Sequence, residues 1–170
     1  MTSTCNTVLT MFGVHRILAA FRRGRGPATA FERGVVALDA GDQKAAALEF
    51  EAALDAATDD PARATIHNKL GVARMALGRR DDALEAFCAA LELDEHCAPA
   101  LVNVGNLFLE DGHPLDAIDY YQAALRADDS YPPAYRHLGI ALRRLGRRAE
   151  AVRALRAADR NAGRPRRSHA

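Results

Sequence analysis

Three side chains near the middle of the chain have the types that could bind a metal ion. Cys88, His96 and Cys97 fall within ten residues of one another, and thiolate and imidazole are common zinc ligands. A tetrahedral zinc site needs a fourth ligand, and none stands at a suitable spacing. The chain's three cysteines form no C-x-x-C pair and leave one over. We therefore predict no metal site, a buried thiol at Cys88 on a helix, and a reducing compartment.

The sequence also lacks the residue patterns of the common catalytic sites. It has no phosphate-binding glycine loop ending in Lys-Ser/Thr, no G-x-S-x-G, and no pair of helical histidines around a glutamate. His67 is expected to be a packed imidazole, and His113 is expected to lie in a turn beside Pro114. These features predict a protein that is not an enzyme and uses no cofactor.

An internal repeat determines how the remaining residues are positioned. Gly71, Gly105 and Gly139 stand 34 residues apart, and each is followed by Gly at 7, Ala at 12, a large apolar residue at 16 and Ala at 19. A fourth copy begins at Gly34, 37 residues before Gly71, so we expect three additional residues in the connector 58–63. The large apolar residues of the four copies are Phe50, Phe87, Tyr121 and Leu155.

Each copy is predicted to fold as two helices joined by a tight turn. Leu70, Met75 and Leu77 have helical spacing, and Gly78 follows them where a left-handed backbone often ends a helix. A glycine in mid-helix, as at Gly71, destabilises a helix by about 1 kcal/mol relative to alanine. We therefore expect a second backbone to approach closely at each such glycine, and the large apolar residues to fill the space between units.

The repeat resembles the tetratricopeptide repeat (TPR) family, whose 34-residue unit reads W-x2-L-G-x2-Y, then A-x3-F, then P. The third copy fits best, with Leu101 to Phe108 followed by Ala117 to Tyr121. The resemblance implies an all-α fold: a right-handed α-solenoid of about four helix-turn-helix units, near 27–60, 64–97, 98–131 and 132–160. Arg74 occupies a position that is bulky and apolar in the family, so its charge must reach solvent or a partner.

Charge divides the chain into three parts. Residues 1–26 carry a net charge of +4, residues 27–130 carry −12, and residues 131–170 carry +9. Val14, Ile17 and Phe21 can share one face of a basic amphipathic helix within 1–26, which would either cap the first repeat or anchor the chain to a membrane or a partner. Residues 161–170 are expected to be a disordered basic tail. Neither a secretory signal nor a membrane span fits the apolar stretch, which favours a cytoplasmic location.

The resemblance also implies a binding surface, because in this family the first helices of the units line a concave groove that holds a peptide. The residues that map onto this groove are Asn68, Lys69, Val72, Met75, Val102, Asn103, Asn106, Leu109, Arg136, His137, Ile140 and Arg143. Asparagine offers both a donor and an acceptor, and arginine binds carboxylates. We expect an acidic or carboxyl-terminal peptide. Asn103 and Asn106 also match common family residues, so they report either ligand binding or ancestry.

These observations predict a non-enzymatic adaptor that binds a partner protein in the groove. The alternative is a self-assembling or membrane-apposed scaffold that uses the basic termini, and nucleic acid is not the expected partner. The clamp by which chaperone-binding members hold a terminal carboxylate is mostly absent, because Asn68, Val72, Pro133 and His137 replace its residues.

Overall fold

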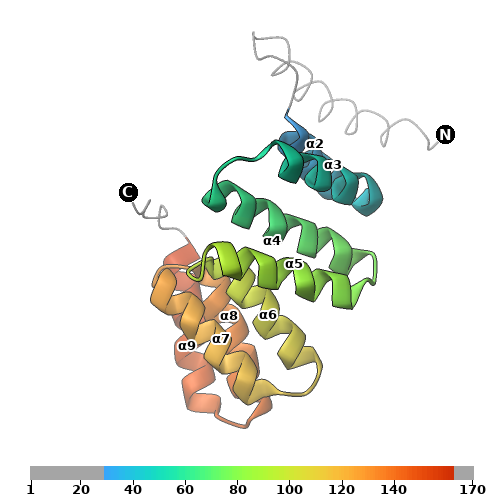
Figure 1. The fold of residues 1–170 in the computed structure, drawn as a ribbon. Coiled ribbons are helices and arrows are strands. Elements are labelled where there is room, and N and C mark those ends of the chain that lie inside the picture. The colour runs from blue at the N-terminus through green and yellow to red at the C-terminus, as the bar shows by residue number, and fades with distance from the viewer. Residues whose placement is uncertain (1–28, 163–170) are drawn as a thin grey trace, which may run out of the picture.

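The protein is described by a computed structural model over residues 29–162, and within this range it consists of four antiparallel helix pairs without strands. Figure 1 shows the pairs stacked in chain order, which confirms the predicted all-α solenoid. The predicted amphipathic segment 1–26 and nearly all of the tail 161–170 lie outside the described residues. The helices are α2 (Ala30–Asp39), α3 (Gln43–Ala56), α4 (Asp60–Ala76), α5 (Arg80–Leu93), α6 (Ala98–Glu110), α7 (Pro114–Ala127), α8 (Pro132–Arg144) and α9 (Arg148–Ala162).

The turn inside each pair depends on a glycine with a left-handed backbone. Gly41, Gly78, Gly112 and Gly146 have φ angles of 78°, 75°, 82° and 74°, which side-chain-bearing residues rarely adopt. After α4 the Gly78 N–H donates to the Met75 carbonyl and the Arg79 N–H to the Arg74 carbonyl, both at 2.9 Å. These bonds satisfy carbonyls that the helix end leaves unpaired. The predicted helix-ending role of these glycines is confirmed.

The mid-helix glycine of each unit accommodates a bulky side chain from the second helix of the same unit. A Cβ atom on Gly105 would lie 2.7 Å from the ring of Tyr121, and one on Gly34 would lie 2.6 Å from the ring of Phe50. The expectation that a second backbone approaches these glycines was therefore wrong for the first three units, because the ring itself takes the space. At Gly139 the Leu155 side chain is nearest, and a Cβ would also lie 3.3 Å from the Ala151 carbonyl oxygen. Tyr121 also reaches the next unit, where its ring centroid lies 5.8 Å from that of His137.

The additional residues between the first two units lengthen a helix. α4 has 17 residues, whereas the corresponding helices α6 and α8 have 13. Asp59 caps α4, and its carboxylate accepts a 2.8 Å hydrogen bond from the Ala62 N–H. Residues 60–63, within the predicted 58–63 connector, thus form the first turn of α4.

Three arginines tie neighbouring units together. The Arg74 guanidinium lies 3.2 Å from the Glu51 carboxylate on α3 and donates to the Asp82 carbonyl at 3.1 Å on α5, which supplies the partner that this partly buried charge requires. Arg80 and Arg144 both reach the end of α6, where they donate to the carbonyls of Leu107 and Leu109 respectively. These guanidinium groups are second donors to the two carbonyls, which also accept from the backbone N–H groups of Asp111 and Gly112.

The two cysteines in the described range differ in exposure. Cys88 is exposed on α5, contrary to the expected buried thiol, because its neighbour Phe87 occupies the inward face of that helix. Cys97 is buried just before α6, and burial raises the pKa of its thiol. Over residues 29–162 no cluster of three His, Cys, Asp or Glu side chains is arranged to hold a metal ion. None of the described helices is long and apolar enough to cross a membrane.

We predict that Gly105→Ala lowers the free energy of unfolding by about 1–3 kcal/mol, the usual range for overpacking a core. The new methyl group would press on the Tyr121 ring, which is completely buried. Gly139→Ala is the matched control, since it presses on the more flexible Leu155 side chain and should destabilise less. Urea unfolding followed by circular dichroism measures both. A Gly105→Ala protein as stable as the parent would contradict the packing described here.

Candidate functional site: the first-helix surface

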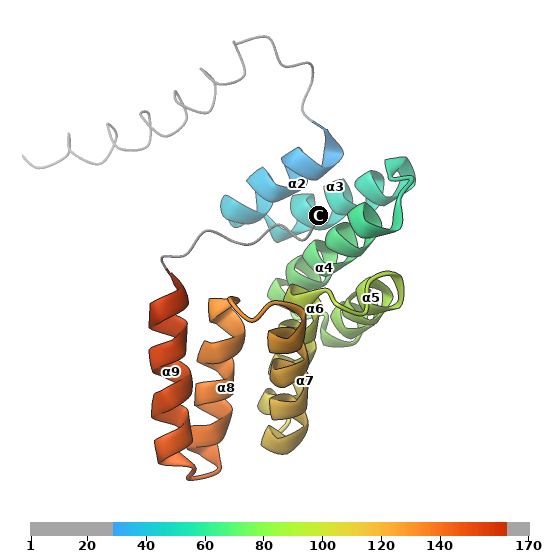
Figure 2. The same cartoon turned by 90° about the vertical axis from the view of Figure 1, so that its left-hand side faces the viewer.

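The residues predicted to bind a ligand lie on the first helices of the second, third and fourth units, α4, α6 and α8. We call this set of residues the first-helix surface. These helices are consecutive neighbours, since α4 contacts α6 and α6 contacts α8. Figure 2 shows the array bending so that α2 and α8 lie on the same side of it. The stacking therefore assembles side chains that are 34 residues apart in the sequence into one surface.

Two of the predicted asparagines bind each other. The Asn103 amide nitrogen Nδ2 donates to Asn68 Oδ1 at 2.8 Å, which joins α6 to α4. Asn68 is only 6% exposed, and a buried amide needs such a partner. Asn103 is half-buried. Asn68 thus lies beneath the surface, and Asn103 is the member of the pair that remains accessible.

The third asparagine is oriented by a tyrosine from the core. The Tyr121 hydroxyl donates to Asn106 Oδ1 at 2.8 Å, and burial raises the pKa of this hydroxyl, which keeps it protonated as a donor. The Tyr121 ring also lies against His137 of α8. Sequence reasoning placed Asn106 and His137 on the surface but missed Tyr121, whose only signal was its place in the repeat.

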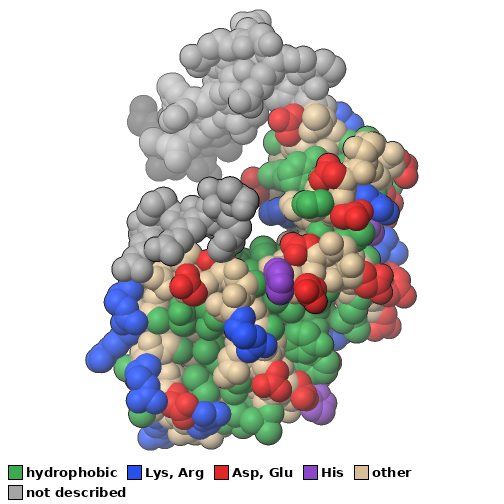
Figure 3. All heavy atoms as spheres, turned by 60° about the vertical axis from the view of Figure 1, so that its left-hand side comes forward, with side chains coloured by type: hydrophobic (Ala, Val, Ile, Leu, Met, Phe, Trp, Pro, Cys, Tyr) green, Lys and Arg blue, Asp and Glu red, His purple; other side chains and the backbone are tan. Residues whose placement is uncertain are grey.

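The cationic side chains of this surface belong to the fourth unit. Arg136 and Arg143 are exposed on α8, and neither forms an ion pair with any residue between 29 and 162. Lys69 on α4 is half-buried and likewise makes no ion pair within that range. In Figure 3 the Lys and Arg side chains gather at the lower left, over the α8 and α9 end of the array.

The apolar members of the predicted set divide into two groups. Val72 and Met75 on α4 and Ile140 on α8 are half-buried and present part of their side chains at the surface. Val102 and Leu109 on α6 are 4% and 5% exposed and belong to the core. The middle of the surface therefore offers amide groups from α6, while the side nearer the carboxyl terminus offers the charge of α8.

We predict that His137 titrates below the ordinary histidine pKa of about 6.5. Burial lowers its pKa most, and the positive charge of Arg136 lowers it further. The unfolded chain then binds the proton more tightly than the folded protein. The stability that neutral His137 contributes is present above pH 6.5 and is lost as the pH falls through the folded-state pKa.

An NMR titration of the imidazole resonances measures this pKa directly. Arg136→Gln should raise the His137 pKa while leaving it below the ordinary value, because burial is the larger cause. His137→Gln should flatten the fall in unfolding free energy between pH 7 and pH 5. A His137 pKa at or above 6.5 would show that the imidazole is more hydrated than its packing against Tyr121 implies.

Comparison with known proteins agrees with this architecture. A profile described as tetratricopeptide repeat matches residues 14–61, 68–132 and 105–165. A crystal structure of MamA aligns with a TM-score of 0.64 at 22% identity, covering 78% of this chain and 76% of the other. The structure of Pseudomonas aeruginosa pilF aligns with a TM-score of 0.68 at 24% identity, covering 78% and 59%.

A third solved structure contains a bound peptide. The second TPR of Spaghetti (RPAP3), bound to the HSP90 peptide SRMEEVD, aligns with a TM-score of 0.53 at 22% identity, covering 56% of this chain and 89% of the other. No curated protein matches the sequence. Because the sequence identities to these solved structures are low, the structural alignments bear on the fold alone. The family profile, in contrast, covers most of the chain. On that basis the chain belongs to the tetratricopeptide repeat family.

Proposed function

We propose that the first-helix surface binds an acidic segment of a partner protein, so that the protein acts as a non-enzymatic interaction adaptor. The observation that carries this proposal is the pair of exposed arginines on α8, Arg136 and Arg143, which have no ion-pair partner among the described residues. Arginine binds carboxylates through two parallel hydrogen bonds. The named residues of the surface include no acid, so nothing among them competes for these cations.

The amides of α6 complement this charge. Asn106 Oδ1 is occupied by the Tyr121 hydroxyl, which leaves the Asn106 amide nitrogen as a donor. Asn103 uses its amide nitrogen on Asn68, which leaves its oxygen as an acceptor. A donor and an acceptor side by side match the carbonyl and N–H groups of an extended peptide backbone. The same hydrogen bonds hold both amides in place before a ligand arrives, and such preorganisation favours binding.

The peptide in the RPAP3 structure supports this proposal by analogy. Its printed sequence, SRMEEVD, contains three acidic residues, the chemistry that Arg136 and Arg143 would bind. The alternative role as a self-assembling or membrane-apposed scaffold depends on the basic ends of the chain. Residues 1–26 lie outside the described range, and the basic residues of α8 and α9 that lie within it include the two arginines on which the adaptor proposal rests. The hydrogen-bonded amides of α6 favour the adaptor.

Charge reversal on α8 tests the proposal. We predict that Arg136→Glu with Arg143→Glu reduces capture of the cognate partner about tenfold or more, which corresponds to about 1.4 kcal/mol. The matched control is Arg148→Glu with Arg160→Glu, which makes the same charge change at exposed positions of α9. Affinity purification with quantitative mass spectrometry identifies the partner, and titration with its acidic segment gives the affinity.

The two double variants separate local binding from net charge. If only the α8 variant loses the partner, the first-helix surface is the site. Equal loss in both variants would show that the overall charge, rather than this surface, attracts the partner. Capture that survives the α8 variant would exclude the proposed role of Arg136 and Arg143.

A further inference from the structure

Equivalent niches occur where successive units meet. Each niche is bounded by the second helix of one unit and by both helices of the next, and we call it the junction niche. The niche is filled by side chains at two repeat positions of the later unit, one on its first helix and one on its second helix. These positions hold Arg74 and Ala86 in the second unit, Phe108 and Tyr120 in the third, and Leu142 and Ala154 in the fourth. The three niches therefore share a backbone framework but differ in what fills them.

The niches of the second and third units are filled by their own side chains. In the second unit the Arg74 guanidinium occupies the space and bonds Glu51 and the Asp82 carbonyl. In the third unit Phe108 and Tyr120 stack, with ring centroids 5.2 Å apart and planes inclined by 17°. Either solution removes a void between the helices, and such voids destabilise protein interiors.

The niche of the fourth unit is open. Leucine and alanine replace the two aromatic residues at its filling positions, and a surface cavity of about 270 Å³ remains between α7, α8 and α9. Figure 2 shows α8 lying between the other two helices. The cavity is lined by Gln122, Tyr135, Leu138, Leu142, Arg147, Glu150, Arg153, Ala154 and Ala157. Its position is that of the stacked pair one unit earlier.

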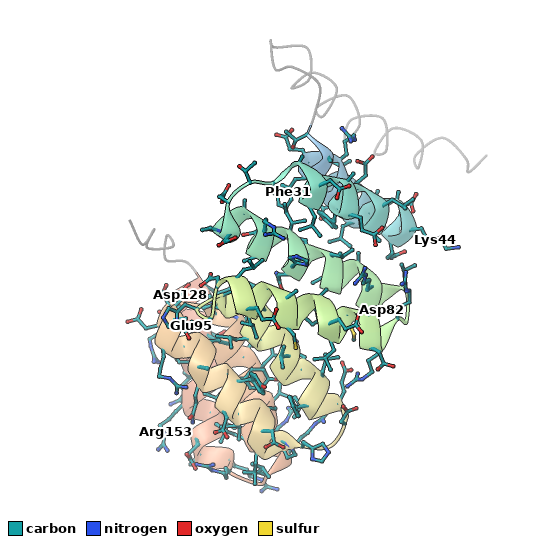
Figure 4. The ribbon with its side chains drawn as sticks, viewed as in Figure 1. Phe31, Lys44, Asp82, Glu95, Asp128 and Arg153 are labelled. Carbon is teal, nitrogen blue, oxygen red and sulfur yellow. The ribbon has the colours of Figure 1, made fainter. Side chains whose placement is uncertain are left out.

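The lining combines an apolar interior with a cationic rim. Leu138, Leu142 and Ala154 contribute hydrocarbon surface. On the rim Arg147 and Glu150 form a two-pronged ion pair with N to O distances of 2.6 and 2.7 Å, which neutralises the rim's carboxylate. Arg153 makes no ion pair within residues 29–162, and Figure 4 shows it at the outer edge of the array. The rim of the cavity therefore carries one net positive charge, that of Arg153.

The size and charge of the cavity identify what it fits. Sites for drug-sized molecules span about 300–1,000 Å³, so this smaller cavity suits a single large side chain. The unit before it shows that aromatic rings fit the same framework. We propose that the open junction niche takes an aromatic side chain of a partner protein, and that acidic residues beside this side chain bind Arg153.

Charge argues against occupancy by the chain's own amino-terminal aromatic residues. Phe21 is followed by Arg22 and Arg23, which have the same sign as the free charge of the rim. The proposed site is also separate from the first-helix surface. α8 contributes Leu138 and Leu142 to the niche, whereas Arg136 and Arg143 belong to the other surface. The inference therefore does not depend on the function proposed above.

The test uses the full chain and a blocked pentapeptide, EEFEE, titrated while the leucine and alanine methyl groups are followed by NMR. We expect saturable shifts at Leu138, Leu142 and Ala157, which line the cavity. Replacing the phenylalanine of the peptide by alanine should reduce the affinity about tenfold, because aromatic anchors dominate such contacts.

Two variants and one control locate the site. Leu142→Phe with Ala154→Tyr copies the filling of the third unit and should abolish binding. Arg153→Glu should weaken binding about tenfold without touching the core, so it keeps the test valid if the double variant fails to fold. Arg160→Glu makes the same charge change elsewhere on α9 and should have little effect. The variant Arg136→Glu with Arg143→Glu should bind EEFEE normally, which separates this site from the first-helix surface.

Several results would overturn the inference. They are the absence of saturable binding, equal affinity for the phenylalanine and alanine peptides, binding that survives both the filled niche and Arg153→Glu, and shifts confined to Val72 and Ile140 of the first-helix surface. Concentration-dependent self-association that the filled niche abolishes would show that the occupant is a second copy of the chain.

Discussion

The array depends on one contact within each helix pair, in which a bulky side chain of the second helix packs against a glycine of the first helix. Side-chain carbons of Phe50, Phe87, Tyr121 and Leu155 each approach to less than 3.0 Å from the position that a Cβ of the facing glycine would take. Alanines on both sides of them, such as Ala117 and Ala124, are completely buried. Together they fix the distance and angle between the two helices of a unit. Because every unit has nearly the same internal geometry, successive units present matching faces and stack in a regular order.

Much of the fold could be predicted because the repeat places the same residue type at the same structural position. The turn glycines are an example, since Gly78 and Gly112 must both adopt a backbone that other residues avoid. The sequence did not show which group approaches the mid-helix glycines, because spacing gives the direction of a side chain around its helix but not the distance between helices. Cys88 was misplaced although the repeat predicted that Phe87 points inward, because successive helical residues point about 100° apart and the residue after Phe87 therefore turns away from the core.

The residue types of the candidate site could be predicted from the sequence, but the hydrogen bonds among these residues could not. Family resemblance pointed to asparagines and arginines on the first helices, and the structure places them there. The bond from Asn103 to Asn68 joins residues 35 positions apart, and the bond from Tyr121 to Asn106 joins a core residue to a surface residue. Both contacts depend on how helices approach one another. The open niche of the fourth unit likewise depends on how α7, α8 and α9 approach one another, which residue spacing does not specify.

Arg80 and Arg144 reach the same helix end from the two units on either side of it. One extends from the second unit and the other from the fourth, and both end on carbonyls in the last turn of α6 in the third. Arg80 is also held by Glu110 and Asp111 at 2.6 and 2.8 Å. In a simple repeat array the stability is a sum over adjacent interfaces, so segments can fray from either end. Both contacts belong to adjacent interfaces, so this array follows the same rule. Detaching the fourth unit removes the Arg144 donor, but Gly112 and Arg80 still bind carbonyls at the end of α6, so fraying from the carboxyl-terminal side can stop at the third unit.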